Sequence, residues 1–226
     1  MFDSTKEDLK DILRDADDGK LQLPDFQRDY VWADEDVRSL IASIAKGFPV
    51  GALLTLETGS EVSFKPRLIV GVPEKKVEPS ELLLDGQQRI TSLYQSTFSG
   101  EPVRTRLRKK KVEVLRHYYL DIKRSVSGNV DLYDAIVGVP EDRIVRTNFG
   151  KDIELDLSAT GLEYENDMFP LDKSFDSKDW FYGWRDHWKP QGRDVVDLEK
   201  DFYLHILERI ERYKICLLYT SPSPRD

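Results

Sequence analysis

The fold is decided by the stretch Leu82-Leu83-Leu84-Asp85-Gly86-Gln87-Gln88-Arg89-Ile90-Thr91-Ser92-Leu93-Tyr94, in which the hydrophobic period changes halfway along. The three leucines form a continuous apolar run, which is typical of a buried strand. Asp85-Gly86 is a turn signal, and from Gln88 onward the apolar residues recur at helical spacing. The stretch therefore predicts a strand, a tight polar turn and the beginning of a helix.

The turn of this stretch places a carboxylate, two amides and a guanidinium within five residues, Asp85 to Arg89. The N-terminus of a helix offers free backbone N–H groups and the positive end of the helix dipole, and both attract anions such as phosphate. Arg89 would add a planar, bidentate donor to such a site. On these residues alone, an Asp-Gly turn followed by a polar helix start explains the pattern equally well.

The length of 226 residues suits one domain, or one domain with an extension. A net charge of -8 argues against a protein coated with positive charge for wrapping nucleic acid, although it allows a local basic site. No stretch approaches the roughly 18 apolar residues of a membrane span. The first residues also lack the layout of a signal peptide. These features predict a cytoplasmic protein without membrane contact.

Hydrophobic periodicity predicts a mixture of helices and strands along the rest of the chain. Three amphipathic helices are expected, over residues 6–18, with Gly19 as the stop, 34–45, with Asp34 as the cap, and 195–213. The aromatic segment 180–188 is expected to pack as a helix onto the core. Strands are expected at 21–23, 51–57, 62–64, 67–70, 117–122, 152–157 and from 213 onward.

The last eleven residues allow two interpretations. Cys216 is the only cysteine, so no internal disulfide can form. Residues 216–226, Cys-Leu-Leu-Tyr-Thr-Ser-Pro-Ser-Pro-Arg-Asp, resemble the translation of a transposon-end sequencing adapter residue for residue. We interpret this segment as an adapter-derived artefact and expect the native sequence to be cut near Ile215. The alternative is a genuine Ser/Pro-rich tail.

Several kinds of chemistry find no pattern in the sequence. The three histidines are scattered without zinc-ligand spacing, and neither a G-x-S-x-G nor a Walker A motif occurs. Two polar clusters remain, Gln27-Arg28 and Asp85 to Arg89. They would suit a phosphate ester if the fold joins them, because arginines neutralise phosphoryl charge, an amide orients water, and Asp85 can hold Mg²⁺ or act as a base.

Three blocks carry a resemblance to a known family: residues 24–32 (Pro-Asp-Phe-Gln-Arg-Asp-Tyr-Val-Trp), residues 47–51 (Gly-Phe-Pro-Val-Gly) and residues 84–93 (Leu-Asp-Gly-Gln-Gln-Arg-Ile-Thr-Ser-Leu). In order and spacing they resemble the N-terminal domain of the GmrSD type IV restriction family, within the ParB/sulfiredoxin-like superfamily. The resemblance implies a compact mixed α+β (α/β) domain over residues 1–122, with a small mixed sheet flanked by helices. A mostly helical extension of the same domain would follow over residues 123–215.

The resemblance also implies one pocket that binds and hydrolyses a nucleoside triphosphate with Mg²⁺, without haem, flavin or zinc. Gln27 and Arg28 would form its first wall, and Asp85, Gly86, Gln87, Gln88 and Arg89 its second. We expect the Gly86 and Gln87 amides to cradle phosphate and Arg28 and Arg89 to clamp it. Asp85 would position metal or water, and Gln27 or Gln88 would orient the nucleophile. Tyr30 and Trp32 are expected to support the loop rather than stack a base.

Related full-length proteins restrict foreign or modified DNA, often through a C-terminal His-Me nuclease domain, which nothing in this sequence matches. DNA contact through the full-length protein is expected, and homo-oligomerisation stays open. A basic run is the candidate DNA contact, and a solvated hairpin is its other interpretation: Arg104, Arg106, Arg108, Lys109, Lys110 and Lys111. The rival functions are a non-catalytic module that senses a nucleotide or modified DNA, and a ParB-like nuclease.

Overall fold

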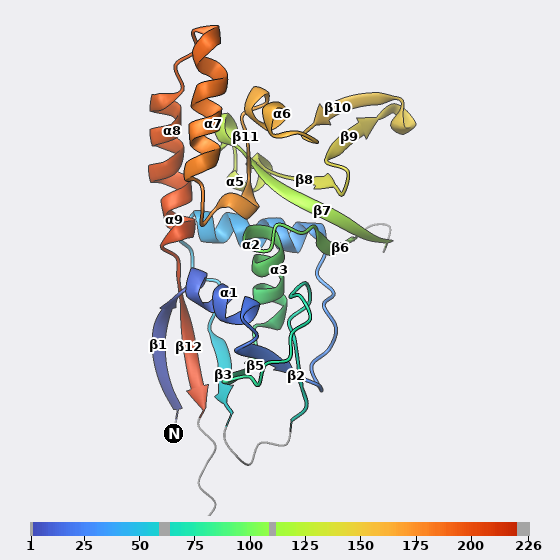
Figure 1. Cartoon of the computed structure of the whole chain (residues 1–226), viewed down its shortest axis with the longest axis vertical. Coiled ribbons are helices and arrows are strands. Elements are labelled where there is room, and N and C mark those ends of the chain that lie inside the picture. Colours follow the sequence, from blue (N-terminus) through green and yellow to red (C-terminus); the bar gives the residue numbers. More distant parts are fainter. Residues whose placement is uncertain (1, 59–63, 109–111, 221–226) are drawn as a thin grey trace, which may run out of the picture.

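The structure is a computed structural model that describes residues 2–58, 64–108 and 112–220. It confirms the mixed α+β fold (Figure 1). The main sheet is six-stranded, in the order β1-β12-β3-β5-β2-β4. Its strands are β1 (Phe2–Asp8), β12 (Lys214–Thr220), β3 (Leu53–Glu57), β5 (Glu81–Asp85), β2 (Leu21–Pro24) and β4 (Pro66–Arg67).

Neighbouring strands of the main sheet come from distant parts of the chain. β12 pairs parallel with β3 and antiparallel with β1, so the two ends of the described chain lie side by side (Figure 1). The start of a strand predicted at residues 213–215 is confirmed by β12, which continues to Thr220, within the segment 216–226 that resembles an adapter translation. Ile215 and Leu217 of this strand are buried. β5 pairs parallel with β2 and antiparallel with β3. The predicted central strand of leucines is therefore enclosed on both edges.

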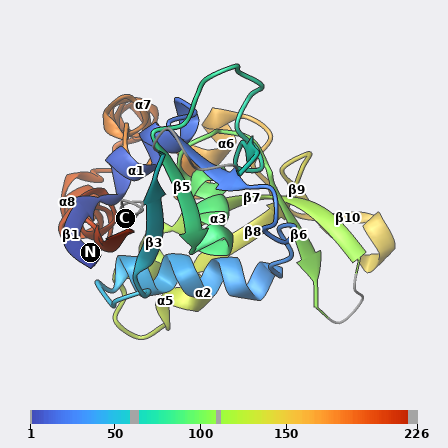
Figure 2. The same ribbon diagram turned by 90° about the horizontal axis from the view of Figure 1, so that it is seen from below.

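A second sheet of four strands lies beyond the first. Its path is β11-β7-β6, and β8 pairs with the other edge of β7. The strands are β6 (Val103–Leu107), β7 (Val112–Asp121), β8 (Ile136–Pro140) and β11 (Met168–Pro170). Three helices pack against the two sheets: α1 (Leu9–Asp17), α2 (Asp34–Ala45) and α3 (Gln87–Thr97). Figure 2 shows α3 nearly end-on in the middle of the fold.

α3 is a central helix, since every one of its residues except Arg89 is buried. The predicted apolar positions Ile90, Leu93 and Tyr94 are confirmed as core. More than half of the buried residues are nevertheless polar. Buried polar groups are stable only when they are hydrogen-bonded, so this helix needs partners on the chain around it.

The N-terminal half of α3 binds the loop that follows β2. The Gln88 amide accepts a hydrogen bond from the Val31 backbone N–H at 2.9 Å and donates one to the Asp29 carbonyl at 3.1 Å. One turn later, the Ser92 hydroxyl lies 2.8 Å from the Tyr30 hydroxyl. Side chains four residues apart share one face of a helix, so these contacts form a single polar stripe.

The same stripe continues to Gln95, whose amide joins two further segments. It donates to the Val70 carbonyl at 2.7 Å and accepts from the Arg104 backbone N–H at 3.0 Å. The neighbouring Tyr94 hydroxyl donates to the Asp17 carboxylate of α1 at 2.6 Å. Burial and this carboxylate raise the pKa of Tyr94, which keeps its hydroxyl a donor. α3 therefore ties α1, β6 and two loops together.

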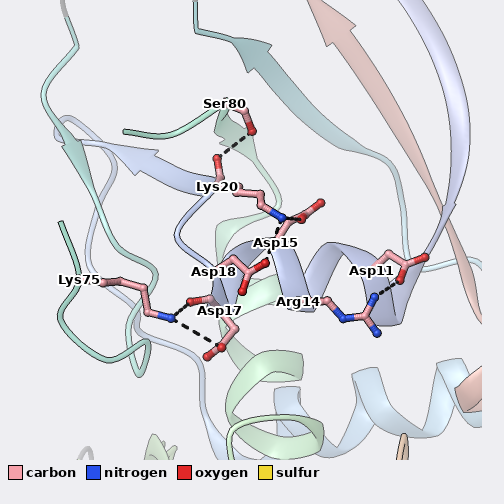
Figure 3. Close-up of polar contacts among 8 residues, drawn as sticks. All are labelled: Asp11, Arg14, Asp15, Asp17, Asp18, Lys20, Lys75 and Ser80. Carbon is pink, nitrogen blue, oxygen red and sulfur yellow. Dashed lines mark hydrogen bonds and ion pairs between the residues drawn. The ribbon is translucent and has the colours of Figure 1, made fainter. Parts of the chain in front are cut away.

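The loop before β5 is fixed at the C-terminal end of α1, as Figure 3 shows. Lys75 donates to the Asp17 carbonyl and pairs with the Asp17 carboxylate at 3.7 Å. The Ser80 hydroxyl donates to the Lys20 carbonyl at 3.3 Å. A lysine at a helix C-terminus satisfies a free carbonyl and complements the helix dipole. The predicted stop at Gly19 is confirmed, with a φ of 76°.

Residues 123–215 contain short strands as well as helices. The α-helices of this part are α4 (Ile122–Val126), α5 (Leu132–Ala135), α6 (Thr160–Glu165), α7 (Lys178–Trp188), α8 (Val196–Phe202) and α9 (Glu208–Glu211). Short 3-10 turns occur at Asn148–Gly150, Leu171–Lys173 and Lys189–Gln191. β9 (Ile144–Thr147) and β10 (Asp152–Asp156) form a hairpin, which confirms the predicted edge strand. Among the described residues, no helix has the length and apolar character needed to cross a membrane.

The predicted aromatic core helix is confirmed as α7, with Trp180, Phe181 and Trp184 buried. Its rings pack with Phe169 of β11, which stacks on Phe181 at a centroid distance of 5.5 Å. The long helix predicted over residues 195–213 is confirmed over residues 196–211, where a π-helical turn at Tyr203–Leu207 joins α8 to α9 without a break. The aromatic segment therefore serves the core of the extension.

Three local predictions are corrected. The first helix begins at Leu9 rather than residue 6, because residues 2–8 pair with β12 as a strand. Asp34 is the first residue of α2 and not its cap, and its carboxylate accepts instead from the Tyr118 hydroxyl at 2.9 Å. The strand predicted at 67–70 is only Pro66–Arg67, and residues 62–63 lie outside the described part.

Replacing Gln95 by Leu tests the polar stripe. The substitution leaves the Arg104 N–H and the Val70 carbonyl without their partner, so we expect the free energy of unfolding in urea to fall by about 1–3 kcal/mol. Gln191→Leu, on an exposed turn, is the matched control and should change it by less than about 0.5 kcal/mol. Equal stability of the two variants would contradict the role given to the stripe.

Candidate functional site

A pocket of about 200 Å³ lies between the loop after β2 and the N-terminus of α3. The structure brings both predicted walls together there. The side that comes from the loop also includes Trp32, which we expected only to support it. The residues lining the pocket are Gln27, Arg28, Trp32, Asp85, Gly86, Gln87, Gln88 and Arg89.

The sheet explains why two segments almost 60 residues apart in sequence meet. β2 and β5 are parallel neighbours, so the segments that follow them leave the same edge of the sheet. The Gln27 side-chain amide then donates to the Leu84 carbonyl at 2.5 Å. Arg67 of β4 donates to the Gln27 and Arg28 carbonyls at 2.9 and 3.2 Å. No pattern in the sequence predicted this supporting role of Arg67.

Gly86 shapes the start of α3. Its φ of 103° is a left-handed conformation, and a Cβ there would lie 2.2 Å from the Leu53 side chain. Only glycine fits both conditions. A glycine cap has no side chain to bind the helix start, and the first intrahelical bond runs from the Ile90 N–H to the Gly86 carbonyl at 3.0 Å. The amides of residues 87–89 therefore have no partner within the helix, at the positive end of its dipole.

Arg89 holds the block that contains Gly51. Its guanidinium donates to the Val50 carbonyl and to the Ala52 carbonyl, each at 2.8 Å, and lies 3.2 Å from the Asp85 carboxylate. Gly51, with a φ of 92°, passes so close that a Cβ would lie 2.6 Å from Arg89 Nη1. Arg89 thus has a structural task in addition to the phosphate contact that we predict for it.

Arg28 and Gln87 are available for a ligand. Within residues 2–58, 64–108 and 112–220, no hydrogen bond or ion pair engages the exposed Arg28 guanidinium. The Gln87 side chain is buried, and neither polar atom of its amide has a partner in that part of the chain. A buried polar group without a partner costs about 1–3 kcal/mol, which a bound water or ligand can offset. The pocket therefore has unused hydrogen-bonding capacity.

The other pocket residues differ in their engagement. Both polar atoms of the Gln88 amide bind the loop backbone, so Gln88 is a support of the site. The Asp85 side chain is 73% exposed. Tyr30, expected to support the loop, is buried, and burial raises its pKa to about 12. Its neutral hydroxyl can therefore keep its hydrogen bond to Ser92 throughout the physiological pH range.

The basic run lies beside the pocket loop. The Thr105 hydroxyl donates to the Trp32 carbonyl at 2.8 Å, and Thr105 lies between the exposed Arg104 and the half-buried Arg106. Arg106 pairs with Glu113 at 3.1 Å and Arg108 with Asp36 at 2.5 Å, whereas the Arg104 side chain is exposed. Residues 109–111 lie outside the described part. DNA contact by this run stays a prediction. No group of three or more metal-binding side chains occurs in the described residues.

Comparison with known proteins gives the family. The model of the GmrSD restriction endonuclease N-terminal domain matches residues 9–216, so the chain belongs to this family, as its three blocks predicted. The chain is also 27% identical to an uncharacterized protein of Methanocaldococcus jannaschii, over 96% of this chain and 36% of that protein. It thus spans about a third of the length of this relative.

The two arginines of the pocket should differ in their effect on stability. Arg89→Ala removes hydrogen bonds from two backbone carbonyls, and we expect the free energy of unfolding to fall by about 1.5–3 kcal/mol. Arg28→Ala removes no observed contact and should change it by less than about 0.5 kcal/mol. Urea denaturation of both variants measures the difference, and a reversed order would show that the assignment is wrong.

Proposed function

We propose that this domain binds a nucleoside triphosphate in the pocket and hydrolyses it, as the N-terminal part of a modification-dependent restriction or anti-phage defence protein. One observation carries the proposal. The guanidinium of Arg28 and the side-chain amide of Gln87, neither of which has a partner among the described residues, line the same pocket as the uncapped start of α3. All three favour an anion, and membership of the GmrSD family supports the setting in restriction.

Each residue has a role in binding under this proposal. Arg28 binds the phosphoryl oxygens, and the backbone amides of Gly86 and Gln87 cradle them. The guanidinium of Arg89 adds charge while it holds the turn. Mg²⁺ is usually bound by one or two carboxylates together with substrate phosphates. Asp85, the carboxylate of the pocket, would hold this ion, which supplies further neutralisation of phosphate charge.

Hydrolysis requires an oriented water. The water oxygen attacks the γ-phosphorus, the bond to the bridging oxygen breaks, and the diphosphate leaves with that oxygen. The water proton passes to an oxygen of the released phosphate. Gln27 is the better of the two predicted amides for orienting this water. Its side-chain nitrogen is bound to Leu84, and its oxygen has no partner among the described residues, whereas Gln88 is fully engaged.

A second candidate is a sensing module that binds the nucleotide without hydrolysing it. The contact between Trp32 and Thr105 favours this candidate, because it connects the pocket loop directly to the basic strand β6. A change of the loop on nucleotide binding would reach Arg104 and Arg106, which flank Thr105. Both candidate functions use the same binding site, and they differ only in whether the bound nucleotide is hydrolysed.

Arg28→Ala should weaken binding of nucleoside triphosphates by about 10- to 100-fold, because one charge-assisted contact to phosphate is lost. Calorimetric titration of the purified chain with ATP, GTP, CTP and UTP in the presence of Mg²⁺ measures this. Arg209→Ala removes the same charge from an exposed position on α9 and is the matched control. Unchanged affinity of Arg28→Ala, or equal losses in both variants, would remove the support for this pocket.

Phosphate release separates hydrolysis from sensing. If the domain is a hydrolase, we expect the wild-type chain to release phosphate and Arg28→Ala to lose this release, measured with and without DNA. Binding without release in either condition favours the sensing module. If the wild-type chain binds none of the four nucleotides, both candidates fail.

A further inference from the structure

Two exposed aromatic rings belong to segments next to the pocket loop, since Phe26 directly precedes Gln27 and its ring contacts Phe64. Phe26 is 61% exposed and Phe64 is 42% exposed, yet their rings touch, with centroids 5.2 Å apart and planes at 68°. A single exposed phenylalanine is ordinary on a protein surface. Two large rings in contact form a continuous apolar patch, and such patches mark places where another molecule binds.

The backbone holds this aromatic pair at a fixed place relative to the pocket. Leu23 and Pro24 of β2 pair with Arg67 and Pro66 of β4, and the Asp25 N–H donates to the Lys65 carbonyl at 3.0 Å. Phe26 and Phe64 come directly after and before these paired residues. In the main sheet β2 lies between β5 and β4, and Figure 1 shows β2 beside β5.

Phe26 also directly precedes the two pocket residues of its loop. Two peptide units separate the Phe26 and Arg28 Cα atoms, which are therefore at most about 7.6 Å apart. The Arg67 guanidinium binds the carbonyls of Gln27 and Arg28 and keeps this short segment in place. The backbone that carries Phe26 is therefore adjacent to the phosphate-binding side of the pocket.

The size of the pocket indicates what the patch can bind. The volume of about 200 Å³ is smaller than the roughly 300–1,000 Å³ of typical small-molecule sites. Its polar lining suits the phosphate end of a nucleotide. The sugar and the base must then lie outside, on the surface next to the pocket, where the Phe26–Phe64 pair offers an apolar face.

We propose that the Phe26–Phe64 pair stacks the nucleobase of the nucleotide whose phosphates occupy the pocket, an inference that rests on the function proposed above. Every base presents a π-face, and aromatic stacking on an open surface is tolerant of base identity. The patch has no hydrogen-bonding group on its rings to read a base edge. The site therefore accepts purine and pyrimidine nucleotides with similar affinity.

Phe48 provides a matched control, because its side chain is 57% exposed and it belongs to the block held by Arg89. No other ring contacts it in the described part of the chain. Phe48→Ala therefore removes the same side chain at nearly the same exposure. The comparison of Phe26→Ala with Phe48→Ala isolates the effect of position.

The experiment is a calorimetric titration of the full chain and both variants with two kinds of probe and Mg²⁺. The probes are the four nucleoside triphosphates and inorganic triphosphate, which has no base. We expect Phe26→Ala to weaken nucleotide binding by about 5- to 100-fold and to leave triphosphate binding unchanged. Phe48→Ala should bind both probes as the wild type does, and Phe26→Trp should restore nucleotide affinity.

Each other outcome has a definite meaning. Wild-type nucleotide affinity in Phe26→Ala overturns the stacking proposal and leaves the phosphate pocket standing. An equal loss for nucleotide and triphosphate overturns it too, because Phe26 then only positions Arg28. If the wild-type chain binds neither probe, the proposed function fails, and the stacking proposal fails with it. Thermal unfolding confirms that each variant is folded.

Discussion

The burial of a polar helix governs this structure. α3 lies in the middle of the fold, where its glutamines and serines are buried. Gln88, Ser92 and Gln95 bind the chain around the helix, since an unsatisfied buried group costs about 1–3 kcal/mol. Gln88 and Ser92 consequently hold residues 29–31 against the helix, and Gln95 holds β6 and the Val70 loop. The same hydrogen bonds that satisfy the core bring the Gln27-Arg28 loop to the start of α3.

The residues of the pocket form two groups. The side chains of one group support the pocket, and the side chains of the other are available to bind a ligand. The side chains of Gln88 and Arg89 donate hydrogen bonds to backbone carbonyls. Gly86 forms the turn that leaves the start of the helix uncapped. The side-chain polar groups of Arg28 and Gln87 have no partner in the part of the chain that the structure describes. In a chain with a net charge of -8, such an arginine beside the positive end of a helix creates a local site for an anion.

Local patterns predicted the elements better than they predicted the contacts between them. The change of period at Asp85-Gly86 was sufficient for the strand, turn and helix, and the amphipathic pattern over residues 6–18 predicted α1 although not its first residue. Pairing of β1 with β12 depends on residues about 210 positions apart, which no local period records. The bonds of Arg89 to the Gly51 block and the contact of Phe26 with Phe64 depend on tertiary packing in the same way. The family motif named the pocket residues, but it did not separate supports from free groups.

The most direct measurement is an amide NMR titration of the wild-type chain with inorganic triphosphate and Mg²⁺. If phosphate binds at the start of α3, the largest shifts will be those of the backbone amides of Gly86, Gln87 and Gln88, with Gln27 and Arg28 next. Amides of the exposed β9–β10 hairpin should not move. Saturable shifts that occur elsewhere, or none at the start of α3, would contradict a phosphate site in this pocket.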